Sequence, residues 1–324
     1  MKSRHKSLFY FISVYLFFSL ILVSCNKDDV IEIKNPNDGK IERPVTSKSS
    51  PYISIVFEYT PAPGQFINDF GSISFDGKIS KQDASNWAYD RLNNRKYVSL
   101  GAFGGFIVMG FDHSVRNTGD YELGVFGNAF ISVNGSSNEP GIIYVMKDEN
   151  GNGKPDDTWY ELRGSDTFAK GTIRNYSVTY FRPQEDGEPV EWIDNFGNTG
   201  QIDYLGSFHS QPSYYPEWID TSQYTLSGTC LLAKTIKDEE TGNWSNPPFK
   251  WGYADNMGDD NIFYDGFSNC NRFKISDAID KNGNSVNLEF IDFIKIQTGV
   301  SSSAGWLGEV STEILGVVDL NILL

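Results

Sequence analysis

Histidine and cysteine are scarce in this chain, and their scarcity limits the chemistry that it can perform. Only three histidines occur among 324 residues, and His5 lies in the N-terminal leader described below. The two that remain, His113 and His209, are too few for a zinc site built on several imidazoles. No Gly-x-Ser-x-Gly stretch marks a nucleophilic serine of the hydrolase kind. The sequence therefore offers no familiar set of catalytic residues.

Basic residues are the minority among the charged residues. The chain has 27 Lys and Arg against 42 Asp and Glu, a net charge of −15, and loss of a leader with Lys2, Arg4 and Lys6 would take this charge to −18. Such a surface repels a phosphate backbone, so we expect no nucleic-acid partner. The same carboxylates are the oxygen ligands that calcium prefers.

One long apolar run is present, and it stands near the N-terminus. Leu8–Val23 follows the basic residues and is shorter than the about 20 residues that a spanning helix needs. This arrangement is typical of a signal peptide over residues 1–24, the alternative being an uncleaved signal anchor. It ends in Leu-Val-Ser-Cys25, which resembles the lipobox of bacterial lipoproteins. We therefore expect cleavage before Cys25, lipidation of its thiol and attachment to a membrane through the acyl chains.

The residues after Cys25 predict a surface location and a tether. Asn26-Lys27-Asp28-Asp29 resembles the export signal of Bacteroidota surface lipoproteins, which implies the outer membrane with the protein facing out. Residues 25–50 are polar and predict a flexible tether, and residues 51–324 are expected to form a single domain. Lipidation of Cys25 leaves Cys230 and Cys270 as an even pair, either a disulfide or two buried free thiols.

Apolar residues alternate with polar ones along most of this domain. Period-two runs rich in β-branched and aromatic residues predict strands near 52–59, 105–111, 121–126, 142–146, 176–181 and 288–296. One helix is predicted from Ser80 by the spacing of Ala84, Trp87, Ala88 and Leu92. The pattern favours an all-β fold, an antiparallel β-sandwich of jelly-roll type with one short helix and long loops, including residues 189–216.

An acidic stretch, residues 148–161, has the spacing of a calcium loop. Counted from its first residue, oxygen donors fall at positions one, three, five and nine, with glycine at six and a backbone carbonyl at seven. Trp159 takes the closing position, so closure would fall to Asp157 or Glu161. The predicted ligands of a structural Ca²⁺ are Asp148, Asn150, Asn152, Lys154 (carbonyl), Asp156, Asp157 and Glu161. The alternative is an acidic hairpin turn without an ion.

Aromatic residues are concentrated between residues 192 and 251, among Asn, Gly, Pro and Ser. Such loop aromatics form platforms that stack against ligands, including sugars, although any single one could instead fill the core. The candidate ligand-binding residues are Tyr214, Tyr215, Trp218, Trp244 and Trp251.

Acidic residues elsewhere are weaker candidates. The run from Asp255 to Asn261 could bind a cation or face a ligand, but it lacks alternating donors with a glycine in register. Glu309 and Glu313 share one face of an extended segment, where they are about 13 Å apart, too far for a glycosidase pair.

Several motifs together resemble a family of Bacteroidota cell-surface lipoproteins. They cover nearly the whole domain and comprise PAPGQF at 61–66, SLGAFGG at 99–105, GFDH at 110–113, GNAF at 127–130, GNGKPDDTWYEL at 151–162 and GWLGEVSTE at 305–313. The resemblance implies a β-sandwich and an accessory binding role, for some members beside TonB-dependent uptake systems of the vitamin B12 type. It carries over no catalytic residues.

These observations favour a surface-anchored, non-enzymatic protein that captures a nutrient, a glycan or a corrinoid, for a TonB-dependent transporter. One alternative is an enzyme that cleaves glycans with a pair of carboxylates. Another is a structural or adhesive surface protein.

Overall fold

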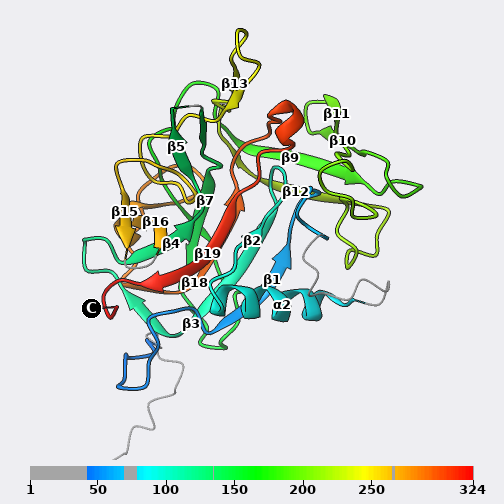
Figure 1. Ribbon diagram of the computed structural model, residues 1–324. Helices are drawn as coiled ribbons and strands as arrows, with labels where there is room; N and C mark the ends of the chain where they lie inside the picture. The colour runs from blue at the N-terminus through cyan, green and yellow to red at the C-terminus, as the bar shows by residue number, and fades with distance from the viewer. Residues whose placement is uncertain (1–41, 69–78, 134, 265–266, 324) are drawn as a thin grey trace, which may run out of the picture. The chain divides into compact units, whose positions relative to one another are not determined.

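The computed structural model describes residues 42–68, 79–133, 135–264 and 267–323 (Figure 1). Ile41–Leu324 form one compact unit. Antiparallel sheets make up most of it and one α-helix is present in the described ranges, which confirms the predicted all-β, sandwich-like fold. No helix in these ranges is long and apolar enough to cross a membrane.

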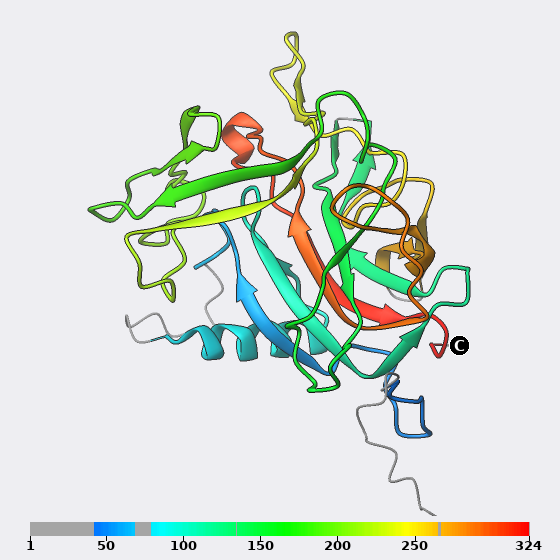
Figure 2. The same ribbon diagram turned by 180° about the vertical axis from the view of Figure 1, so that it is seen from behind.

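The larger sheet has six strands in the order β1-β3-β18-β7-β8-β17. Figure 2 shows β1, β3 and β18, in blue, teal and orange, side by side along it. In the middle of the sheet Ile296 of β18 pairs with Ile107 of β3. The bounds are β1 Ile55–Thr60, β3 Phe106–Arg116, β18 Phe290–Thr298, β7 Gly141–Met146, β8 Tyr160–Leu162 and β17 Ala278–Ile279.

A five-stranded sheet, ordered β15-β16-β4-β19-β2, shares its core with the first. Side chains such as Val125 and Val317 of this sheet and Ile107 and Ile294 of the six-stranded one belong to a single buried cluster. Removal of this apolar surface from water is the main source of the fold's stability. The bounds are β15 Asn261–Tyr264, β16 Phe267–Phe273, β4 Leu123–Gly127, β19 Glu313–Asp319 and β2 Val98–Ser99.

Smaller elements complete the unit. A four-stranded sheet has the order β11-β10-β9-β12, so the loop predicted for residues 189–216 is wrong where β10 and β11 pair. Buried Val190 and half-buried Trp192 pack this hairpin onto the core. The bounds are β9 Ile173–Phe181, β10 Val190–Asp194, β11 Thr199–Ile202, β12 Gln223–Cys230, β5 Phe130–Ser132, β6 Gly135–Ser137, β13 Ile236–Lys237, β14 Trp244–Ser245, and 3-10 turns at Ile275–Asp277 (η1) and Gly305–Leu307 (η2).

The predicted helix is α2, Lys81–Asn93. Ser80 caps its N-terminus and exchanges hydrogen bonds with Asp83 in a capping box, which satisfies backbone N–H groups that have no helical partner. The four apolar residues that predicted the helix are all buried, and Trp87 stacks on Tyr59 of β1 at 5.9 Å between ring centroids. The local sequence therefore specified this element correctly.

The structure decides between the two alternatives left open for the cysteines, and it corrects the end of the predicted tether. Cys230 and Cys270 are both free and buried, on β12 and β16, so they form no disulfide, and burial raises the pKa of each thiol to about 12. The predicted tether also ends too late, because Arg43 is already held by the domain. Its guanidinium pairs with Asp292 at 3.1 Å and donates to the carbonyl of Phe111 at 2.9 Å.

Candidate functional site

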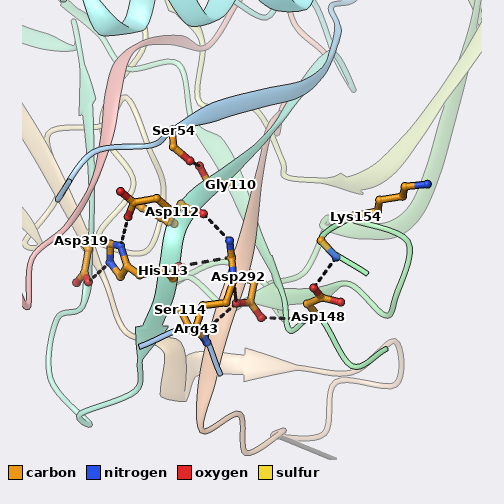
Figure 3. A network of polar contacts seen from close by, with 12 residues as sticks. Arg43, Ser54, Gly110, Asp112, His113, Ser114, Asp148, Lys154, Asp292 and Asp319 are labelled. Carbon is orange, nitrogen blue, oxygen red and sulfur yellow. Dashed lines mark hydrogen bonds and ion pairs between the residues drawn. The ribbon is translucent and has the colours of Figure 1, made fainter. Parts of the chain in front are cut away.

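The acidic loop folds around the side chain of Asp148 (Figure 3). Asp148 is 4% exposed, and its two carboxylate oxygens accept hydrogen bonds from the backbone N–H groups of Asn152 and Gly153, at 3.1 and 2.9 Å. Gly151 and Gly153 have φ of 69° and 74°, the region that glycine adopts without strain. The turn is therefore built as the glycine spacing predicted.

The other predicted calcium ligands in the loop form hydrogen bonds with the loop itself. The side-chain amides of Asn150 and Asn152 donate to Asp156, whose pKa these hydrogen bonds lower. The N–H of Glu149 donates to Asp157 at 2.9 Å. The side chains of the loop thus bond within it, and calcium binding there stays a prediction.

One residue of the predicted ligand set does not belong to the loop. Glu161 lies on β8, where the hydroxyl of Thr229 donates to its carboxylate at 2.6 Å and Arg174 approaches to 3.7 Å. It lines a separate cavity of about 190 Å³ with Trp159 and Lys295. The prediction that Glu161 closes the calcium loop is wrong, because side chains alternate along the β8 strand and this one points to the cavity.

The loop is held to the six-stranded sheet by Asp292, which is fully buried on β18. Its carboxylate accepts hydrogen bonds from the N–H of Asp148 at 2.8 Å and from the hydroxyl of Ser114 at 2.5 Å, besides pairing with Arg43 (Figure 3). One buried carboxylate thereby joins the N-terminal segment, β3 and the acidic loop.

The histidine of the GFDH motif, near this network, is also buried. His113 is fully buried, and its ring nitrogens bond to Asp112 at 2.6 Å and to Asp319 at 2.9 Å (Figure 3). Burial lowers its pKa, but hydrogen bonds to the two carboxylates outweigh burial, so that the pKa is raised. These contacts give His113 a structural role in the fold.

Three of the predicted ligand-binding aromatics lie in the core. Tyr214, Tyr215 and Trp218 are at most 1% exposed. Their polar atoms bond to backbone carbonyls, for example the indole N–H of Trp218 to that of Tyr59 at 3.2 Å. The prediction is wrong for these three, because the segment passes beneath other elements and its aromatics fill the core.

The remaining two tryptophans lie at different places on the surface. Trp251 is half-buried beside a small crevice of about 30 Å³. Trp244 is half-buried on β14 and lines a cleft of about 490 Å³. The volume of this cleft lies in the range of small-molecule sites.

The rim of the cleft is aromatic. Trp306 of η2 and Phe130 of β5 are 54% and 53% exposed, and Phe208 is 64% exposed. Gly305 fits closely against the indole of Trp244, since a side chain on Gly305 would approach Nε1 to 2.5 Å. Figure 1 shows η2, in red, near β13 and between the β5 and β10–β11 regions. Exposed aromatic faces of this kind suit stacking.

The floor of the cleft is acidic. Glu139, Glu309 and Glu313 line it, so the 13 Å separation expected for an extended Glu309–Glu313 segment did not exclude a shared site. Glu309 accepts a hydrogen bond from the N–H of Gln65 at 2.8 Å. The backbone at Gly64 lies close to the same carboxylate. A Cβ at this position would be 2.5 Å from a carboxylate oxygen of Glu309, so glycine leaves room for this contact.

The fully buried Asp255 lies next to this acidic floor. Its carboxylate accepts from the N–H groups of Asn128, Ala129 and Glu313, at 2.9, 2.7 and 2.9 Å. One carboxylate oxygen from each of Asp255, Glu139 and Glu313 lies within 4.8 Å of the others. The sequence had marked the run at Asp255 only as a weak cation candidate, and it gave no signal that Glu139 would meet it.

Burial raises the pKa of every carboxyl group in this floor. The pKa of Glu309 rises to about 8, and those of Glu139 and Asp255 rise well above their usual range, with the neighbouring carboxylates as the second cause. The pKa of Glu313 is also raised. Glu309 is therefore mostly protonated at neutral pH, whereas an exposed glutamate would have lost its proton.

Three buried oxygens in the cleft have no hydrogen-bond partner. They are Oδ1 of Asn246, Oε2 of Glu309 and Oε1 of Glu313, half of the six such side-chain atoms in the described part of the chain. Their residues are 6%, 5% and 4% exposed. Buried polar atoms are normally bonded, so these three oxygens are available for hydrogen bonds to a bound molecule.

Distant motifs meet at this cleft. Gln65 and Phe66 come from PAPGQF, Asn128 and Phe130 from GNAF, and Trp306, Glu309 and Glu313 from GWLGEVSTE. No protein-family model matches the chain, and no curated protein shows significant similarity to it. The assignment of the site therefore depends on its geometry.

Proposed function

We propose that this protein binds a carbohydrate, without cleaving it, in the cleft between the aromatic rim and the acidic floor. The observation that carries the proposal is the set of three buried oxygens without hydrogen-bond partners at Asn246, Glu309 and Glu313. An unpaired buried donor or acceptor costs about 1–3 kcal/mol, and a ligand hydroxyl that hydrogen-bonds to it recovers this free energy. A sugar presents several such hydroxyls.

The rim and the charge of the cleft support the same ligand class. The C–H faces of a sugar ring pack on aromatic faces such as those of Trp244 and Trp306, while its hydroxyls reach the floor. Neither lysine nor arginine occurs among the residues lining the cleft, which disfavours an anionic ligand. A corrinoid, with its macrocycle and nucleotide loop, is larger than a cleft of about 490 Å³.

Tryptophan fluorescence during titration with a panel of neutral glycans and with cobalamin tests this proposal. We expect one glycan class to bind, and Trp244→Ala to weaken its affinity about tenfold, equivalent to about 1.4 kcal/mol. Trp251→Ala is the matched control, because Trp251 is also half-buried but lines a different crevice. Binding of cobalamin alone, or an equal loss in both variants, would contradict the proposal.

A second candidate function, glycan cleavage, is favoured by Glu309. Burial raises the pKa of this residue to about 8, so it is protonated at neutral pH, as a general acid must be, and further carboxylates share the cleft. Analysis of the same incubations for released sugar separates the candidates. Hydrolysis that is lost in Glu309→Gln would establish the enzyme, whereas binding without product supports capture.

The place of action that we propose is the outer cell surface, beside a TonB-dependent transporter, with Cys25 as the lipid anchor. Support comes from the leader, the Leu-Val-Ser-Cys25 stretch and the acidic residues that follow it. Cells fed an alkyne-labelled fatty acid should label the wild-type protein and not Cys25→Ala. Equal labelling of both would overturn the anchor.

A further inference from the structure

We propose that Glu139, Asp255 and Glu313 hold one divalent cation of the calcium class at the floor of the cleft. The three residues come from distant parts of the sequence, and one carboxylate oxygen of each lies within 4.8 Å of the other two. Calcium takes oxygen ligands at about 2.3–2.6 Å, so ligands on opposite sides of the ion are about 5 Å apart. Three oxygens at this spacing fit around a single ion.

Charge favours a cation at this point. No ion pair joins any of the three carboxylates to a lysine or arginine in the described ranges. Buried like charges repel one another strongly when nothing compensates them. A divalent cation compensates two of the negative charges that the three groups carry when they are ionised.

The unpartnered oxygens give an independent indication. Oε1 of Glu313 is buried without a partner, and so is Oε2 of Glu309, which lies outside the trio but lines the same cleft. Asp255 is fixed by three backbone N–H groups, of which only that of Glu313 donates to Oδ2. Oδ2 therefore retains a lone pair for a cation.

The donor set selects the kind of cation. Every member of the trio is a carboxylate, and neither histidine nor cysteine belongs to it. Hard oxygen ligands of this kind suit calcium, whereas zinc sites favour nitrogen and sulfur. Three protein ligands leave further coordination positions, and those toward the cleft suit sugar hydroxyls. This last step depends on the proposed carbohydrate binding.

Calorimetric titration of EDTA-stripped protein with calcium chloride, without any glycan, tests the site. We expect the wild type to bind, and Glu313→Gln and Glu139→Gln each to weaken that binding by at least about tenfold. Glu139 is partly exposed, so its variant supplies the test if Glu313→Gln does not fold. Asp148→Asn, which alters the separate acidic loop, should leave this binding event unchanged. Calcium binding with wild-type affinity in both glutamate variants would overturn the inference. A single calcium-binding event that is lost only in Asp148→Asn would also overturn it, because it would place the ion in the acidic loop.

A glycan titration with and without EDTA then separates this inference from the proposed function. Calcium binding that depends on Glu313, with no glycan bound, supports the cation site and overturns the carbohydrate proposal. If the wild type binds no calcium and binds the glycan equally well in EDTA, the carbohydrate proposal is supported and the cation site is overturned.

Discussion

Trp218→Ala is expected to lower the free energy of unfolding by about 3–5 kcal/mol, as large core truncations do. The indole is 1% exposed, packs on Tyr59 at 5.4 Å between ring centroids, and donates its N–H to the carbonyl of Tyr59. Its removal leaves a cavity and an acceptor without its donor. Equilibrium unfolding in guanidinium chloride measures the loss.

Trp306→Ala is the matched control for this experiment. Trp306 is 54% exposed on the rim of the cleft, so its removal should change the free energy of unfolding by no more than about 0.5 kcal/mol. If Trp218→Ala were as stable as Trp306→Ala, the assignment of Trp218 to the core would fail, and its place as a ligand-binding residue would have to be reconsidered.

Asp292→Ala should destabilise the protein by about 3–5 kcal/mol, because it breaks a buried pair and leaves the partners without their acceptor. The N–H of Asp148, the hydroxyl of Ser114 and the guanidinium of Arg43 all lose this carboxylate. The loss should appear as a lower denaturant midpoint. The acidic loop and the segment at Arg43 should also become more open to proteolysis, since Asp292 holds both.

Arg116→Ala is the control for this variant. The Arg116–Glu42 pair also joins the N-terminal segment to β3, but the arginine side chain is 70% exposed. Exposed pairs contribute about 0–1 kcal/mol, so a small loss is expected. An Asp292→Ala variant no less stable than Arg116→Ala would contradict the role given to the buried network.

The sequence predicted well those features that depend on neighbouring residues. Alternation specified strands such as β3 and β18, and the spacing of apolar residues after Ser80 specified α2. The glycines of the acidic loop specified its turn. Each of these signals is local, because backbone periodicity and positive-φ positions are properties of a short segment.

The same local reasoning was wrong wherever burial decided the role of a residue. Proline and serine neighbours indicated exposed loop aromatics at Tyr214, Tyr215 and Trp218, but other segments cover them. Trp244 remains at the surface, although its local composition looks similar. Which aromatic is covered depends on chain that lies far away in the sequence, and no local pattern records it.

By itself, the sequence determined the β-rich class, the helix, the turn of the acidic loop and the scarcity of histidine and cysteine. Only the tertiary structure decided that Glu139, Asp255 and Glu313 would meet, and that Trp244 and Trp306 would stand above them. The reason is physical: strand pairing and core packing bring together residues that lie far apart in the sequence. The packing of the whole domain holds these three carboxyl groups together, and their burial raises the pKa of each.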